Sequence, residues 1–187
     1  MTGSAPAAGS TVTGRTLVAG VGNIFQRDDA FGVEVTRLLA DRTWPGGVEI
    51  ADFGIRGIHL AYELLDGCAL LILVDAAARG LAPGTVTVAE VRPEDDPPPA
   101  AVMDAHGLAP DQVFAAIESL GARPGRTLLV ACEPADVSAG MGLSDPVREA
   151  LPHAVRAVED IIQGNGAHDD QAADRGSRPS GGAGHGA

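Results

Sequence analysis

Four side chains that could carry chemistry follow or end successive segments of this 187-residue sequence: Asp29, Asp52, Asp75 and His106. Asp29 comes shortly after the first apolar segment, Asp52 and Asp75 end the second and third, and His106 follows a proline-rich loop. If the apolar segments are parallel strands, ligands collect beyond their carboxyl ends, where all four residues can converge. Two carboxylates and an imidazole suit a divalent ion such as Ni²⁺ or Zn²⁺ and leave coordination positions open.

Each of these residues also has a simpler interpretation. An aspartate at the start of a helix commonly caps it, which is the role we expect for Asp28 and an alternative for Asp29. Asp75 alone could cap an element or bind a turn amide, and His106 alone could begin a helix without binding a ligand. Their coincidence at one edge of a sheet favours a shared site formed by Asp29, Asp75 and His106.

The segment around Asp29, LVAGVGNIFQRDDAFGVEV (residues 17–35), also looks like a nucleotide-binding turn. It supplies only two of the three glycines of the dinucleotide-binding pattern, because Phe25 occupies the third position. Asp52 ends the second strand, where that fold places its ribose-binding acid, so a small nucleotide-binding α/β protein stays an alternative. Against it, Asp28 and Asp29 lie where helix N–H groups would attract a phosphate, and two carboxylates would repel one.

Apolar segments of strand length alternate with amphipathic segments of helical spacing, which predicts a three-layer α/β fold with helices on both faces of the sheet. The sheet should be twisted, five-stranded and mostly parallel. Residues 84–91 alternate in polarity and follow the third strand too closely for a crossover helix, so they should form an antiparallel neighbour or an edge strand. The predicted strands are 15–21, 47–53, 68–76, 84–91 and 126–134, and the predicted helices are 28–41, 57–66, 106–121 and 145–164.

The ends of the sequence lack a periodic apolar face, so we expect residues 1–14 and 164–187 to be disordered tails around one domain over 15–163. The formal charge is −12, and no stretch clusters lysine and arginine, which argues against nucleic acid as a partner. No apolar run approaches the ~20 residues that span a bilayer, and the two cysteines form no recognisable motif. A soluble, cytoplasmic monomer without membrane contact is expected.

No standard nucleophile is evident, because the sequence lacks both a His-Glu-x-x-His helix and a Gly-x-Ser-x-Gly turn. Cys132 should be a small buried apolar residue rather than a nucleophile or ligand. Glu133 could orient a water molecule, although an exposed loop position is the default expectation. His59 and His153 should face solvent or pack without a ligand. Asp52 should help to position a substrate without being an essential ligand, since it ends the strand next to the site.

Four motifs make the sequence resemble the hydrogenase maturation endopeptidases, which trim the large subunit of nickel-iron hydrogenases. They are GVGNIFQRDDAFGVEV, LILVDAA, MDAHGLAPDQVF and ACEPADVSAGMGLSDPV, and the similarity covers residues 16 to 162. The resemblance implies that Asp29, Asp75 and His106 bind metal and carry catalysis. The sequence differs from the usual pattern of the family at Ala30, where a glycine is common. Asp29 stands where some members have glutamate.

The resemblance further implies that the partner is a hydrogenase large-subunit precursor and that the nickel is bound in that precursor, with no organic cofactor. A C-terminal extension would then be cut once, by a metal-activated water or by attack on a carbonyl polarised by the metal. An alternative of another class is a non-catalytic module that binds the same precursor and checks it for nickel.

Overall fold

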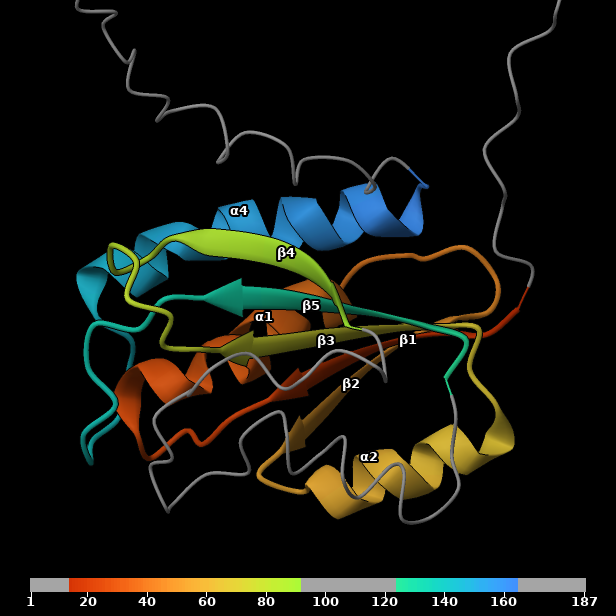
Figure 1. Cartoon of the computed structure of the whole chain (residues 1–187), viewed down its shortest axis with the longest axis horizontal. Helices are drawn as coiled ribbons and strands as arrows, with labels where there is room; N and C mark the ends of the chain where they lie inside the picture. Colours follow the sequence, from red (N-terminus) through yellow and green to blue (C-terminus); the bar gives the residue numbers. More distant parts are fainter. Residues whose placement is uncertain (1–13, 92–123, 165–187) are drawn as a thin grey trace, which may run out of the picture.

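The computed structural model describes residues 14–91 and 124–164, which form a five-stranded sheet in the order β2-β1-β3-β5-β4 (Figure 1). Neighbouring strands are parallel except β4, which pairs antiparallel with β5 at the edge. This confirms the predicted fold class and the edge position of residues 84–91. The strands are β1 (Thr16–Val21), β2 (Val48–Gly54), β3 (Leu70–Ala76), β4 (Val86–Val91) and β5 (Arg126–Cys132).

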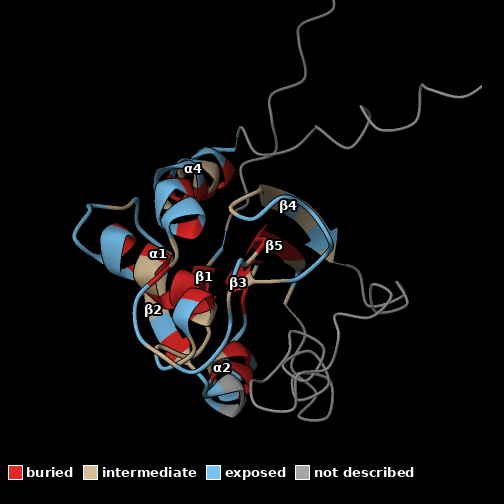
Figure 2. Cartoon of the chain, turned by 90° about the vertical axis from the view of Figure 1, so that its left-hand side faces the viewer, coloured by how far each residue is buried: buried red, intermediate tan, exposed pale blue. Residues whose placement is uncertain are grey.

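Helices cover both faces of the sheet, as the three-layer prediction requires. Helices α1 and α4 pack on one face, and α2 packs on the other (Figures 1 and 2). The segment predicted as one helix over 28–41 begins with a short 3-10 turn, and the last helix ends two residues before its predicted end. The helical elements are η1 (Arg27–Ala30), α1 (Phe31–Ala40), α2 (Gly57–Glu63), η2 (Leu64–Asp66) and α4 (Asp145–Ile162).

Strand β3 is the centre of the sheet, and its side chains alternate between two apolar cores. Leu70, Ile72 and Val74 pack with α1 and α4, whereas Leu71 and Leu73 pack with α2. All five are at most 4% exposed. A parallel strand covered on both faces needs this continuous apolar sequence, which explains why LLILV shows no alternation of polarity.

Glycines allow α1 to pack directly against the backbone of β1 and β3. A Cβ atom on Gly32 would lie 2.2 Å from the carbonyl oxygen of Val74 and 2.3 Å from that of Val21. A Cβ atom on Gly20 would lie 2.3 Å from the carbonyl oxygen of Gly32. Glycine is therefore required in the strand and in the helix, because any side chain would separate them.

Some predicted features lie outside the described residues. They are His106 with its predicted helix over 106–121, the proline-rich loop before it, and almost all of the two predicted tails. Within residues 14–91 and 124–164, none of the helices combines the length and apolarity needed to cross a membrane.

The close approach of α1 can be tested by Gly32→Ala, with Gly46→Ala as the matched control. The new methyl group would overlap two backbone carbonyls, so we expect the free energy of unfolding in urea to fall by about 2–3 kcal/mol. A Cβ atom on Gly46 has no neighbour within 4 Å, so the control should unfold like the wild type. Equal stability of the two variants would contradict this account of the packing.

Candidate active site

The strand order reverses at the carboxyl ends of β1 and β3, the position where open α/β sheets have a crevice between their loops. After β1 the chain moves to one side of the sheet, to β2, and after β2 it returns to β3 on the other side. Such a reversal separates the loops above the two neighbouring strands, which is where open α/β sheets bind ligands. Asp29 follows β1 in the turn η1, and Asp75 is the penultimate residue of β3. Both residues therefore lie at the carboxyl ends of neighbouring strands.

Asp75 is a buried carboxylate at this crevice, with 4% of its surface exposed. Its Oδ1 accepts the Ala76 N–H at 2.8 Å. Burial raises the pKa of Asp75 well above its ordinary value, and the negative charge of nearby Asp29 raises it further, while the Ala76 bond acts in the opposite direction. The negative charge of Asp29 thus disfavours ionisation of Asp75.

Asp29 is half-buried, and its Oδ2 accepts the backbone N–H of Asn23 at 2.7 Å. Burial raises the pKa of Asp29, and the Asn23 bond partly opposes that shift. Across residues 14–91 and 124–164, neither Asp29 nor Asp75 forms an ion pair with lysine or arginine. Two adjacent carboxylates without a cationic partner make an arrangement that a bound cation would stabilise.

The hydrogen bond from the Asn23 N–H to Asp29 bears on the nucleotide-binding interpretation. The Asn23 N–H belongs to the glycine turn, where a dinucleotide-binding protein would present amides to phosphate. Here the Asp29 carboxylate already accepts that N–H. Gly22, at φ +132°, is required because a Cβ atom would lie 1.8 Å from the Asp29 carbonyl oxygen. The glycine turn therefore holds a carboxylate in place and does not favour a phosphate.

Asp28 does not cap the helix, so that prediction is wrong. Its side chain is fully buried and accepts four hydrogen bonds from another segment: Ala135 N at 2.8 Å, Asp136 N at 2.9 Å, and Ser144 N at 2.6 Å and Oγ at 2.9 Å. Burial alone would raise the pKa of Asp28, but these bonds, led by the Ser144 amide, hold it below its ordinary value. The carboxylate remains charged because tertiary contacts supply donors that capping rules do not anticipate.

The backbone of the same two segments is also paired. The Arg27 N–H donates to the Gly140 carbonyl at 3.1 Å, and the Gly140 N–H donates to the Phe25 carbonyl at 2.8 Å. The Asp28 N–H donates to the Asp136 carbonyl at 3.1 Å. Arg27 adopts a left-handed φ of +47°, unusual for a residue with a side chain, and its Nε lies 3.2 Å from an Asp136 carboxylate oxygen.

Glu133 and Cys132 lie at the end of β5, on the same edge. The default expectation that Glu133 is exposed is wrong: it is 7% exposed and accepts the N–H groups of Arg79 at 2.7 Å and Gly80 at 3.2 Å, which fixes the loop after β3. Cys132 is fully buried, as predicted. Burial raises the pKa of its thiol to about 11, with contributions from the charges of Asp28 and Glu133, so it is a poor nucleophile.

The other sequence candidates remain peripheral or untested. Asp52 is exposed at the carboxyl end of β2, beside Gly20 in the register, and its Oδ1 accepts the Gly54 N–H at 2.8 Å. His59 and His153 are exposed, as predicted. Because His106 lies outside the described residues, its proximity to Asp29 and Asp75 remains a prediction. In the part of the chain that the structure describes, no three His, Cys, Asp or Glu residues are grouped to hold a metal.

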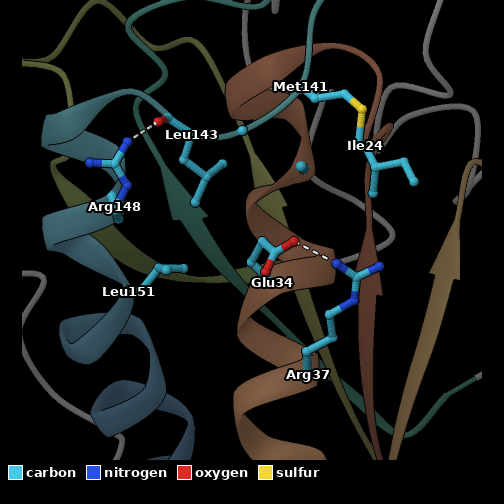
Figure 3. A pocket seen from close by; sticks show the side chains of 9 residues that line it. Ile24, Glu34, Arg37, Met141, Leu143, Arg148 and Leu151 are labelled. Carbon is cyan, nitrogen blue, oxygen red and sulfur yellow. Dashed lines mark hydrogen bonds and ion pairs between the residues drawn. The ribbon is translucent and has the colours of Figure 1, made fainter.

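A pocket of about 460 Å³ lies between α1, α4 and the loop that contains residues 141–143 (Figure 3). Its wall includes the apolar side chains of Ile24, Met141, Leu143 and Leu151. Charged groups at its rim are paired, for example Arg37 with Glu34 at 2.6 Å. Sequence reasoning did not identify this pocket, because its lining comes from three separated segments.

Comparison with known proteins identifies relatives across most of the chain. Residues 33–161 match the family model described as hydrogenase maturation protease. The hydrogenase expression/formation protein HupM of Azotobacter chroococcum mcd 1 is 35% identical over 161 residues, covering 83% of this chain and 71% of the relative. The hydrogenase 2 maturation protease of Escherichia coli K12 is 30% identical over 156 residues, covering 81% and 93%.

A solved structure supports the same relationship. The hydrogenase maturating endopeptidase HybD from E. coli superposes with a TM-score of 0.64 at 28% identity, covering 81% of this chain and 94% of that chain.

The buried charge at Asp75 can be tested by thermal unfolding of Asp75→Asn across pH. Because the pKa of Asp75 is raised in the folded protein, its protonated form stabilises the fold. That stabilisation is fully present below the ordinary aspartate pKa and is lost as pH rises through the raised pKa. The amide cannot ionise, so at neutral pH we expect a Tm about 2–4 °C above wild type, equivalent to roughly 1 kcal/mol.

The difference in Tm between Asp75→Asn and wild type should shrink as pH falls toward the ordinary aspartate pKa. Asp52→Asn is the control, because its exposed carboxylate should leave Tm unchanged throughout. A lower Tm for Asp75→Asn at neutral pH would show that the charge of Asp75 stabilises the fold.

Proposed function

Because the chain belongs to the hydrogenase maturation protease family, we propose that its peptidase activity removes the C-terminal extension of a nickel-loaded hydrogenase large-subunit precursor. The observation that carries this proposal is the Asp29–Asp75 pair at the β1/β3 crevice, two carboxylates with no cationic partner among the described residues. Such a pair is suited to a cation that arrives with the substrate.

In the proposed reaction, Asp29 and Asp75 provide two oxygen ligands to the nickel ion of the precursor, and His106 provides a nitrogen ligand. Burial and the charge of Asp29 favour the protonated form of Asp75, so binding of the ion would release that proton to solvent. The ion activates a water or polarises the scissile carbonyl. The buried Cys132 thiol, with a pKa of about 11, is not available as an alternative nucleophile.

A protein substrate also requires a docking surface near the carboxylates. Phe25 and Met141 are 62% and 72% exposed, and both belong to the paired loops that contain Asp28. Exposed apolar side chains grouped beside a site are typical of protein-binding surfaces. Asp52, exposed at the end of β2, is placed to orient the bound chain without acting as a ligand.

The nickel requirement can be tested by following removal of the C-terminus from nickel-loaded and nickel-free precursor. We expect cleavage of the loaded precursor only, and we expect Asp29→Asn and His106→Ala each to lower the rate by more than about 100-fold, or roughly 3 kcal/mol. His59→Ala is the matched control, because that exposed histidine should not affect the rate.

Two results would refute this mechanism: equal cleavage of nickel-free precursor, or full activity of either ligand variant. Binding of the loaded precursor without cleavage would instead favour the non-catalytic nickel-checking module.

The docking surface can be tested with the double variant Phe25→Ser, Met141→Ser. We expect KM for the loaded precursor to rise about tenfold, which corresponds to 1.4 kcal/mol of lost binding, while kcat changes little. Leu65→Ser is the control, since that exposed leucine precedes β3 and so belongs to the opposite edge of the sheet. An unchanged KM in the double variant would exclude this surface.

A further inference from the structure

Asp28 is a buried carboxylate with an unusual set of partners. All four of its hydrogen-bond donors belong to the segment 135–144, and none comes from its own helix. It has no ion pair with lysine or arginine in the described residues. Burying a charge without an opposite charge is unfavourable unless hydrogen bonds compensate for lost hydration. A pairing of apolar side chains could join the same segments without that cost.

Its place in the chain gives Asp28 a direct connection to the site. Asp28 and Asp29 are consecutive residues of the four-residue turn η1, and their side chains bind different segments. Asp28 contacts residues 135–144, whereas Asp29 accepts the Asn23 N–H and lies close to Asp75. Fixing the Asp28 carboxylate therefore fixes the backbone of η1, and with it the direction of the Asp29 side chain.

The neighbouring backbone supports this connection. Arg27 holds its left-handed φ while its N–H donates to Gly140, and the Asp28 N–H donates to Asp136. A strained residue keeps such a conformation only where the surrounding structure fixes it. The segment 135–144 thus holds η1 through the backbone N–H groups of Arg27 and Asp28 as well as through the Asp28 side chain.

We propose that Asp28 is a positioning residue, whose four hydrogen bonds to residues 135–144 set the direction of the Asp29 carboxylate. This inference rests on the proposed peptidase reaction, in which Asp29 contacts the substrate's nickel. Asp28 itself is fully buried, so it is not placed to contact the ion or the precursor.

The test is Asp28→Asn, because asparagine keeps the shape but has one acceptor oxygen and places an NH₂ group against N–H donors. In the free protein, we expect hydrogen exchange at the amides of Ala135, Asp136 and Ser144 to accelerate at least tenfold, while the amides of β3 and β5 keep their rates. With nickel-loaded precursor, we expect kcat to fall at least tenfold with little change in KM, because Asp29 acts on the reacting group.

Two control variants separate positioning from general stability. Ser144→Ala removes one of the four bonds without removing a helix cap, because Ser144 makes no side-chain capping bond to α4. It should accelerate hydrogen exchange at the same amides and lower kcat, in both cases by less than Asp28→Asn does. Val158→Ala truncates a fully buried residue of α4 and should lower Tm while leaving the local exchange and kcat unchanged.

The inference is overturned if Asp28→Asn opens the three amides but keeps the wild-type kcat, or if it changes only KM. If Asp28→Asn does not fold, Ser144→Ala decides: unchanged exchange at Ala135 and Asp136, or unchanged kcat, overturns the inference. Failure of the wild type to cleave loaded precursor would refute the proposed function itself, and the exchange measurement would still show whether Asp28 holds the two segments together.

Discussion

The contact between α1 and the backbone of β1 and β3 is the constraint on which the site depends. Gly20 and Gly32 place no side chain of their own in this contact, so the helix lies directly on the sheet. The turn between β1 and α1 must then be tight, and Gly22 accommodates the Asp29 carbonyl at a distance no side chain would allow. Asp29 is consequently held above the end of β1, one strand away from Asp75. The glycines act through packing, not through phosphate binding.

A second feature of the carboxyl edge is the number of acids placed there without basic partners. Asp28 and Glu133 accept backbone N–H groups from neighbouring loops, and these bonds compensate for lost hydration. Asp29 and Asp75 each accept one backbone N–H and remain close to each other. The edge thus holds two carboxylates, Asp28 and Glu133, that fix loops. For the other two, Asp29 and Asp75, hydrogen bonds compensate only partly for lost hydration. The second pair is the one that we propose binds the nickel of the substrate.

The comparison with a solved relative places the chain in a known fold. Aspartate has a short side chain, so in the proposed reaction the backbone at position 29 must be held close to the ion. The bonds from residues 135–144 to Asp28 provide that positioning from a segment more than a hundred residues away in sequence. The loops that result also present Phe25 and Met141 to solvent.

The sequence by itself determined the layer architecture and the antiparallel edge strand, because the periodicity of apolar residues is a local property. It also placed Asp29 and Asp75 at one edge of the sheet, because the carboxyl ends of neighbouring parallel strands lie together. It also identified Cys132 as a buried residue. It failed for Asp28 and Glu133, which appeared to be a helix cap and an exposed loop acid. Their donors come from Ser144 and Arg79, residues that are remote in sequence. Only the tertiary structure could decide these roles, because a carboxylate's burial and charge depend on which distant amides surround it.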